Sequence, residues 1–415
     1  MILASRNRQN DVKKIIKIGK QTYFLYFSSG KVEVSIARAF IYSNAFFFRR
    51  IFLKKNNTNQ VFDELIACSN DYQVKKGKGI AKQLKASGLR PIVISPETIF
   101  QNITQNHFIF FMELYFFWIV FFIRILRSYK RRKSPMKVML IQNSMRYMYN
   151  LFCAEDILSK TTKVISIDPS DPFSRSFMYA RGCEYNKTIV IPFGFPSEDA
   201  KNTPIDSKIY YGVSGLYSAK KIERRSKSKK VQIIGDVFGL GNLFDTEYNP
   251  KSVLFISAPH INKQIGGVNG QVSEEMYKKI LSKLITANLA NLELRVRPHP
   301  VDNNLDHLSY LESRGEIKID HSENIGSGLL IGFSSTMIFD ALVKKVPFIC
   351  LVDGMENDHL ELKKNGYPYV FDFNSNLRNI FHVNKDNDFR DTLKMYVEYS
   401  GDNATKQLIH FLKKI

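Results

Sequence analysis

Short apolar runs that alternate with helical segments constrain the fold of this chain more than any other feature. Each run is apolar almost throughout, which is typical of a strand covered on both faces of a parallel sheet. The sequence therefore predicts an α/β protein built on parallel sheets. The predicted strands are Glu64–Ser69, Pro91–Ser95, Lys137–Gln142, Lys163–Asp168, Thr188–Pro192, Lys208–Val213, Val231–Gly235, Ser252–Ser257, Leu292–Val296, Glu316–Asp320, Gly328–Gly332 and Pro347–Leu351.

The length of 415 residues suits two such domains. Asp236–Pro250 is rich in Gly, Asn and Asp and is the best candidate for a linker between them. We predict a first lobe over residues 1–245 and a second over 246–415. The pattern predicts a hairpin before the first sheet, over Thr22–Ser28 and Val32–Ile36, and a helix over Asp388–Lys414.

The charge balance predicts anionic partners. Lys and Arg total 60 against 39 Asp and Glu, a net charge of +21. A nucleotide phosphate or an acidic membrane surface fits this excess. The basic residues are spread widely along the chain, so we do not expect nucleic-acid binding. No cysteines form a C-x-x-C pair, and Met1–Lys20 lacks an apolar run of signal-peptide length, so we expect a cytoplasmic protein with reduced thiols.

One stretch, Phe108–Leu126, is apolar over a length near that of a membrane span. Its charges are Glu113 and Arg124, and a basic cluster from Arg127 to Lys133 follows. A transmembrane helix would place Glu113 in the bilayer, and a core helix is rarely apolar all round. The third interpretation is a helix at the membrane surface, with the basic cluster on anionic lipid. We expect this third arrangement for residues 108–133, on the inner membrane.

The motif Arg297-Pro298-His299-Pro300 stands directly after a predicted strand. Ligands bind at the carboxyl ends of strands in open α/β sheets. A histidine between two prolines is held rigidly and can donate a hydrogen bond to a phosphate. We predict His299 as a catalytic residue and Arg297 as a donor-binding residue. The alternative for His299 is a turn residue with no ligand.

Two further stretches have the pattern of phosphate-binding loops. Ser334, Ser335 and Thr336 lie between a predicted strand and a predicted helix, where hydroxyl and backbone N–H groups can bind an anion. The alternative for them is helix capping alone. The loop after Ser257 contains His260, Gly266 and Gly267, whose backbone can approach a diphosphate or a sugar; glycine-rich loops are common, so this pattern is weak by itself.

Transfer to a hydroxyl group needs a general base near the acceptor. Asp168 ends a predicted strand of the first lobe and is our first choice, with Glu155 and Asp156 as alternatives. A capping role is the other interpretation of each. No D-x-D stands at a strand end, so a carboxylate-held metal is not predicted.

The order of these motifs resembles the second lobe of the bacterial GT-B sialyltransferases, which act on lipooligosaccharide and capsule. The resemblance covers about residues 250–352 and depends on His299-Pro300 and Ser334-Ser335. It implies two Rossmann-like lobes facing a central cleft. It also implies that His299 and the serine pair bind the donor phosphate. The acidic-acidic-Gly motif that supplies the base in that group is not found in the first lobe.

CDP-glycerol transferases of teichoic-acid synthesis are also similar, through His-Pro and a Ser-Ser followed by Phe339-Asp340. Val231–Asp236 resembles the last strand of the first lobe in GT-B transferases and UDP-sugar 2-epimerases. We expect a metal-independent glycosyltransferase with a nucleotide-sugar co-substrate and no further cofactor. CMP-sialic acid is the donor implied, and lipopolysaccharide, lipooligosaccharide or capsule is the acceptor. A CDP-glycerol-type transferase and a non-catalytic glycan- or membrane-binding protein are the alternatives.

Overall fold

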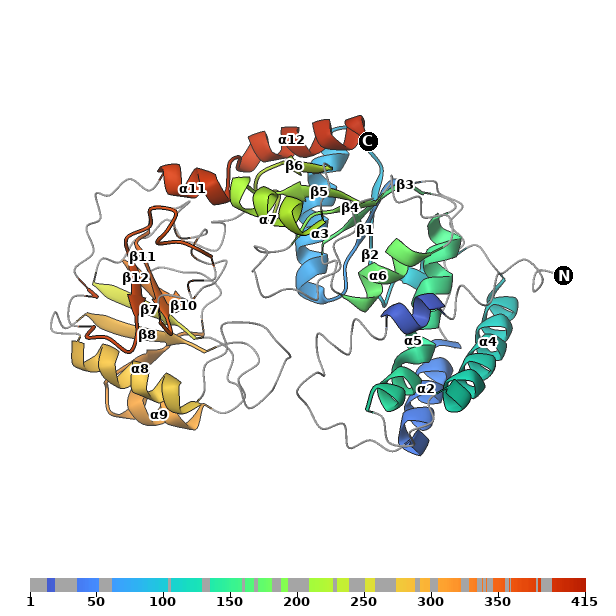
Figure 1. Cartoon of the computed structure of the whole chain (residues 1–415), viewed down its shortest axis with the longest axis horizontal. Helices are drawn as coiled ribbons and strands as arrows, with labels where there is room; N and C mark the ends of the chain where they lie inside the picture. The colour runs from blue at the N-terminus through green and yellow to red at the C-terminus, as the bar shows by residue number, and fades with distance from the viewer. Residues whose placement is uncertain are drawn as a thin grey trace.

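The computed structural model folds the chain into two lobes, each built around one parallel sheet (Figure 1). Each sheet has six strands in the part of the chain that the structure describes. The described residues are 13–18, 36–51, 62–103, 106–128, 135–158, 161–167, 171–180, 188–192, 209–226, 230–238, 251–257, 274–287, 292–298, 305–321, 328–333, 338, 341, 346–354, 358, 360–377, 380–381 and 390–415.

The first sheet has the strand order β2-β1-β3-β4-β5-β6, with every neighbouring pair parallel. The chain leaves β1 for β2 on one side and returns to β3 on the other, so the topological switch lies between β1 and β3. Its strands are β1 (Phe62–Ala67), β2 (Pro91–Ile94), β3 (Thr161–Ser166), β4 (Thr188–Val190), β5 (Tyr210–Val213) and β6 (Val231–Ile233). The helices of this lobe are α2 (Ile36–Ile51), α3 (Asp71–Ala86), η2 (Ile99–Asn102), α4 (His107–Ser128), α5 (Pro135–Leu158), α6 (Pro172–Tyr179) and α7 (Leu216–Ser226).

The second sheet has the order β12-β11-β10-β7-β8-β9 and is also parallel throughout. Its switch lies between β7 and β10, because the chain runs outward through β8 and β9 before it returns. The strands are β7 (Ser252–Ile256), β8 (Glu293–Arg297), β9 (Lys318–Ile319), β10 (Leu329–Phe333), β11 (Phe348–Val352) and β12 (Val370–Asp372). Its helices are α8 (Glu274–Ala287) and α9 (Asp306–Ser313).

Burial explains why these strands are apolar throughout. Every residue of β10 and β11 is buried, since side chains on both faces of the sheet enter the core. Helix α8 covers one face with Ile280, Leu281 and Leu284, which belong to the same core cluster. The prediction of an α/β fold with two parallel sheets is confirmed.

The end of the chain returns to the first lobe. Helix α11 (Arg390–Tyr396) lies beside the second lobe and α12 (Gly401–Lys414) lies over the first (Figure 1). Leu408 and Phe411 of α12 belong to one core cluster with Ile66 of β1 and Ile165 of β3. The last helix therefore completes the core of the lobe in which the chain begins.

The lobes meet through close backbone contacts near this return. The rings of Tyr217 on α7 and Tyr396 on α11 lie 4.9 Å apart between centroids. The amide of Glu398 donates to the carbonyl of Ser214 at 3.0 Å. A side chain at Gly215 would overlap the backbone of Tyr396, so glycine permits this approach.

Three predicted elements differ in the structure. Lys137–Gln142, predicted as a strand, lies inside α5. Asp388–Lys414, predicted as one helix, is divided into α11 and α12. Ile36, predicted to end a hairpin strand, instead begins α2; the rest of that predicted hairpin lies outside the described residues. Most of Asp236–Pro250, the predicted linker, also lies outside them, as residues 239–250 do.

Candidate functional site

The carboxyl ends of β10, β7 and β8 lie side by side at one edge of the second sheet. β10 ends at Phe333, β7 at Ile256 and β8 at Arg297. Neighbouring strands are about 4.8 Å apart, so the ends of β8 and β10 are separated by roughly 10 Å. The switch between β7 and β10 is where open α/β sheets bind ligands. Ser334 follows β10 directly, and His299 follows β8 by two residues.

Of the predicted site residues, Arg297 is the one that falls within the described part of the chain. The two predicted donor loops and the predicted base therefore stay predictions. The predicted residues outside the described ranges are Asp168, His260, Gly266, Gly267, His299, Ser334, Ser335 and Thr336.

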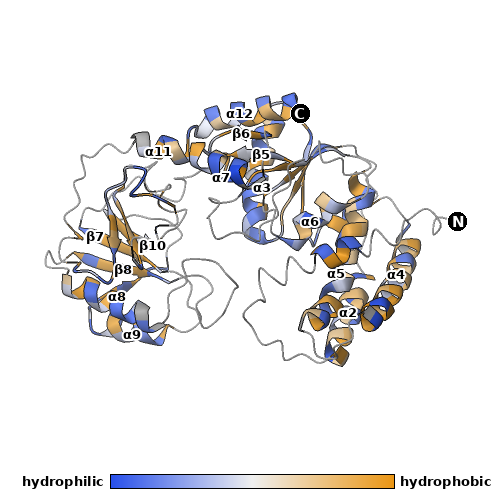
Figure 2. Ribbon diagram, viewed as in Figure 1, coloured by the Kyte–Doolittle hydropathy of each residue, from blue (hydrophilic) through white to orange (hydrophobic). Residues whose placement is uncertain are grey.

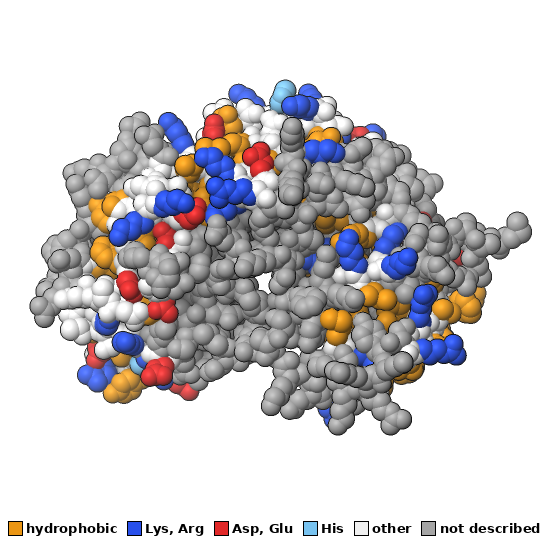
Figure 3. All heavy atoms as spheres, viewed as in Figure 1, with side chains coloured by type: hydrophobic (Ala, Val, Ile, Leu, Met, Phe, Trp, Pro, Cys, Tyr) orange, Lys and Arg blue, Asp and Glu red, His pale blue; other side chains and the backbone are white. Residues whose placement is uncertain are grey.

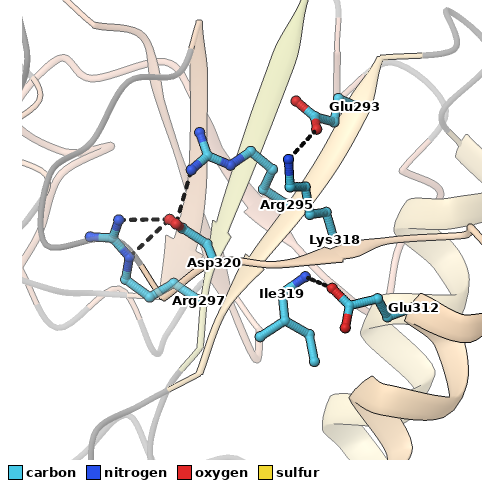
Figure 4. A network of polar contacts seen from close by, with 7 residues as sticks. All are labelled: Glu293, Arg295, Arg297, Glu312, Lys318, Ile319 and Asp320. Atoms are coloured by element: carbon cyan, nitrogen blue, oxygen red, sulfur yellow. Dashed lines mark hydrogen bonds and ion pairs between the residues drawn. The ribbon is translucent and has the colours of Figure 1, made fainter.

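Arg297 is held at its strand end by a buried carboxylate (Figure 4). It donates to Asp320 Oδ2 from Nε at 3.1 Å and from Nη2 at 2.6 Å. Arg295, two residues earlier on β8, donates from Nη2 to the other oxygen, Oδ1, at 2.9 Å. Asp320 follows β9, and its side chain is 2% exposed. We call these three residues the Arg295–Asp320–Arg297 cluster.

The cluster carries one net positive charge, because two guanidinium groups share one carboxylate. Both arginine side chains are less than one-fifth exposed, so this charge is only partly screened by water. A fixed positive charge beside a topological switch favours an anionic ligand such as a phosphate. The geometry thus places a partly buried cation at the edge from which the predicted phosphate-binding stretches begin.

Arg295 and Asp320 are site residues that the sequence analysis did not identify. A usable pattern was present, since residues two apart on a strand share one face and both are arginines. The carboxylate of Asp320 could not be recognised as their partner from the sequence, because it meets the two arginines through the pairing of β8 with β9. In that pairing Arg295 lies opposite Lys318 and Val296 opposite Ile319. Outer contacts support the cluster, including Glu293 with Lys318 at 3.4 Å and Glu312 Oε1, which accepts from the Ile319 amide at 2.8 Å (Figure 4).

A hydrogen bond joins the residues that follow β11 and β12. Asn374 Nδ2 donates to Asp353 Oδ1 at 2.8 Å. Lys283 of α8 donates from Nζ to the carbonyls of Phe373 at 2.7 Å and of Asn374 and Ser375 at 3.2 Å. These contacts stabilise the edge of the sheet, and we give the residues that make them no catalytic or binding role.

In the first lobe, the acidic alternatives to Asp168 are Glu155 and Asp156, both on α5. Glu155 lies 3.6 Å from Lys14 Nζ and its side chain is largely buried. Asp171, three residues after Asp168, caps α6, since its side chain accepts from the Ser174 amide at 2.9 Å. The strand β3 ends at Ser166 beside the switch of the first sheet, and Asp168 comes two residues later in the sequence. Within the described ranges, no group of three or more His, Cys, Asp or Glu side chains could hold a metal ion.

No family model matches this sequence, and no curated protein matches it. Solved structures do resemble it. A UDP-GlcNAc 2-epimerase from Neisseria meningitidis, bound to UDP-GlcNAc, has a TM-score of 0.52 at 12% identity and covers 85% of this chain and 100% of its own. A second UDP-N-acetylglucosamine 2-epimerase has a TM-score of 0.50 at 10% identity and covers 86% and 95%.

The fold is GT-B. The GT-B chain described here matches those enzymes over both lobes, which confirms the predicted architecture. The wall teichoic acid polymerase TagF covers 99% of the chain and 98% of its own at 11% identity, with a TM-score of 0.47. Identities of 10–12% show a shared fold alone. The activity of this GT-B protein must therefore be argued from its own residues.

Proposed function

We propose that the protein is a GT-B glycosyltransferase that binds a nucleotide-activated sugar at the carboxyl edge of its second sheet. The observation that carries this proposal is the Arg295–Asp320–Arg297 cluster at the end of β8. It supplies fixed positive charge beside the strand ends that precede His299 and Ser334. A sugar linked through phosphate is a substrate that such an edge can hold.

In the proposed reaction, an acceptor hydroxyl attacks the anomeric carbon of the donor sugar. The new glycosidic bond forms as the bond between that carbon and the phosphate oxygen breaks, and the nucleotide leaves with the electron pair. Negative charge grows on the departing phosphate, where His299, Ser334 and Ser335 would stabilise it electrostatically. Asp168, after β3 in the first lobe, would take the proton of the acceptor hydroxyl. Closure of the lobes would exclude water and so favour transfer over hydrolysis.

Within this class we propose CMP-sialic acid as the donor. The support is the sequence order of Arg297-Pro298-His299-Pro300 and Ser334-Ser335, which resembles the bacterial GT-B sialyltransferases. The acceptor proposed on the same basis is a surface glycan: lipopolysaccharide, lipooligosaccharide or capsule. A CDP-glycerol-type transferase remains the alternative, since Phe339-Asp340 follow the serine pair as in that group.

A donor screen tests the nucleotide class. The purified protein is heated with CMP-sialic acid, CDP-glycerol, UDP-GlcNAc and the free nucleotides, and the unfolding temperature is recorded. We expect the largest increase with CMP-sialic acid, because ligands that bind the native state alone raise its stability. An increase in unfolding temperature with CDP-glycerol alone would indicate a polyol-phosphate transferase instead. Epimerisation of UDP-GlcNAc without an acceptor would indicate an epimerase instead.

A matched pair of histidine variants tests the catalytic assignment. His299→Ala is expected to lower the turnover number by about 100- to 1000-fold, as when one donor to a developing anion is lost. His321→Ala is the control, because His321 is exposed and lies beyond β9 at the same edge. Equal turnover in the two variants would contradict the role of His299. Thermal unfolding of both excludes a loss of fold.

A further inference from the structure

Helix α4 has two apolar faces, of which the protein covers one. Seven large apolar side chains on it are buried, and they are Phe110, Phe111, Leu114, Phe117, Trp118, Phe121 and Ile125. Eight others are exposed, and they are Phe108, Ile109, Met112, Phe116, Ile119, Val120, Ile123 and Leu126. At about 100° per residue, the exposed set falls within roughly one third of the helix circumference and the buried set opposite it. We call the exposed set the α4 outer face.

The α4 outer face is large and contiguous. It runs from Phe108 to Leu126, about 27 Å along the helix at 1.5 Å per residue. Phe108 is 70% exposed, Met112 57% and Phe116 50%. Phe40 of α2 lies 5.1 Å from the ring of Trp118 and 5.0 Å from that of Phe122, and Ile41 and Phe48 on α2 are exposed as well. Exposed apolar surface of this extent marks an interaction site.

Figure 2 shows α4 as mostly hydrophobic, at the side of the first lobe away from the second lobe. In Figure 3, hydrophobic side chains gather at that side of the molecule with Lys and Arg beside them. The face is therefore well separated from the edge of the second sheet where we place the donor.

The buried face of α4 argues against a membrane span. Helix α4 contains the stretch Phe108–Arg127, which is long and apolar enough to cross a membrane. Trp118, however, donates from Nε1 to Ser144 Oγ on α5 at 2.8 Å, and Phe117 lies 5.6 Å from the ring of Phe152. A spanning helix would lose these contacts and remove seven side chains from the core of the lobe. Glu113, which a span would place in lipid, is buried against the protein.

The charges around the α4 outer face distinguish a lipid surface from a second copy of the chain. Helices α2 and α4 contain five arginines, and their one acidic residue is the buried Glu113. Two copies meeting through this face would bring like charges together, which disfavours self-association. Anionic headgroups complement the four of these arginines that are exposed, while the apolar side chains enter the acyl boundary. The exposed four are Arg38, Arg49, Arg124 and Arg127, and the fifth, Arg50, lies over the rings of Phe46 and Tyr149.

We infer that the α4 outer face docks on the surface of an anionic bilayer, with α4 lying in the membrane plane and its Trp118 side kept against the protein. This inference concerns the surface alone and holds whether or not the protein transfers sugar. It places the first lobe, and with it the acceptor side of the proposed reaction, next to lipid.

Vesicle flotation of the full-length protein tests the apolar part. Vesicles of phosphatidylcholine with about 30% phosphatidylglycerol supply the anionic surface. The wild type is expected to float with them, and combined serine substitutions on the outer face should lower the vesicle partition coefficient on the order of 100-fold. The test variant combines Phe108→Ser, Met112→Ser, Phe116→Ser and Ile123→Ser. The control variant combines Tyr72→Ser, Leu216→Ser and Tyr310→Ser, which are exposed apolar residues elsewhere, and should bind as the wild type does.

A second pair of variants tests the charges. Arg124→Gln with Arg127→Gln should weaken binding at low salt and make it less dependent on salt. Lys82→Gln with Lys85→Gln, exposed on α3 of the same lobe, should change neither. Failure of the wild type to bind, or unchanged binding in the serine variant, would overturn the inference. So would a lipid-free dimer, seen by analytical ultracentrifugation, that the serine variant dissociates.

The single tryptophan of the chain reports on the orientation of α4. Trp118 faces the protein, so brominated lipids should quench its fluorescence weakly in the docked state. Phe116→Trp in a Trp118→Phe background moves the indole to the outer face and should be quenched strongly. Strong quenching of the wild type would indicate a helix surrounded by lipid, and would refute the in-plane arrangement.

Discussion

Arg297 donates two hydrogen bonds to one oxygen of Asp320, and Arg295 holds the other oxygen. Both carboxylate oxygens thus accept from an arginine, and the guanidinium of Arg297 is fixed at the end of β8. Asp320→Asn removes the negative charge and leaves two arginines facing one neutral amide. We expect the free energy of unfolding to fall by about 1–3 kcal/mol, as for loss of hydrogen bonds to a charged group. We also expect weaker donor binding, since Arg297 is no longer held in place.

Urea unfolding and titration calorimetry measure these two effects. Glu293→Gln is the matched control in the same network, because Glu293 and its partner Lys318 are largely exposed. Its stability should stay within about 0.5 kcal/mol of the wild type, the usual range for a surface pair. Equal loss of stability in the two variants would show that Asp320 contributes no more than a surface carboxylate.

Two adjacent carboxyl groups on β1 should give pH dependences of opposite sign. Burial, with a smaller contribution from Asp63, raises the pKa of Glu64. The folded state then holds the Glu64 proton to a higher pH than the unfolded state, so stability falls as pH rises between the two pKa values. Glu64→Gln should therefore raise the urea midpoint at pH 7, and the gain should disappear below the unfolded pKa near 4.5.

Asp63→Asn is the internal control of that experiment. A hydrogen bond from the side chain of Arg90 lowers the pKa of Asp63. Its contribution to stability is present above the unfolded pKa near 3.8 and is lost as pH falls through the folded value. The substitution should therefore destabilise the protein at pH 7 and have no effect in strong acid. Changes of the same sign in the two variants would contradict this assignment.

Glycine at position 215 should be required for the contact between the lobes. A Cβ atom there would overlap the backbone of Tyr396, which cannot move aside as a flexible side chain would. Gly215→Ala should cost about 1–3 kcal/mol of unfolding free energy, the range for overpacking. Gly79→Ala on α3 is the control, because nothing lies within 4 Å of its added carbon. It should stabilise the helix by about 0.5–1 kcal/mol, and a loss comparable to that of Gly215→Ala would show that steric overlap is not the cause.

Three cysteines should resist alkylation while the protein is folded. Cys68, Cys153 and Cys350 are buried thiols. Burial raises the pKa of the Cys68 thiol to about 12, so little reactive thiolate forms at pH 8. Iodoacetamide followed by mass spectrometry should label these three residues in urea but not in buffer. Rapid labelling of Cys68 in buffer would mean that β1 opens at its carboxyl end.

The strands were predictable because they are buried on both faces. β10 and β11 lie within one residue of the predicted ranges, since an uninterrupted apolar run has few other uses in a polar chain. The prediction of a strand over Lys137–Gln142 was wrong for the same reason. Residues 137–141 of α5 are all buried, so the helix offers no polar face from which its period could be recognised.

The site was less predictable than the fold. Arg297 was identified from its place after a strand, which depends on local sequence alone. Asp320 lies 23 residues away and meets Arg297 because β8 pairs with β9 in one register. The break between α11 and α12 also depends on distant contacts, since the Tyr399 carbonyl accepts from the amide of Asp236 at 2.7 Å. The local pattern that predicts one helix over Asp388–Lys414 contains no information about this contact with Asp236.

The return of α12 to the first sheet has a consequence for how the protein is made. Leu408 and Phe411 cover a face of β1 and β3, strands that leave the ribosome more than two hundred residues earlier. During synthesis α3 covers part of that face with Ile80, Ala81 and Leu84, and the rest stays open until α12 emerges, because no described helix of the second lobe before it belongs to this cluster. The first lobe, although translated before the second, is therefore finished only after it, and a nascent chain stalled anywhere in the second lobe would present unfinished apolar surface from the first.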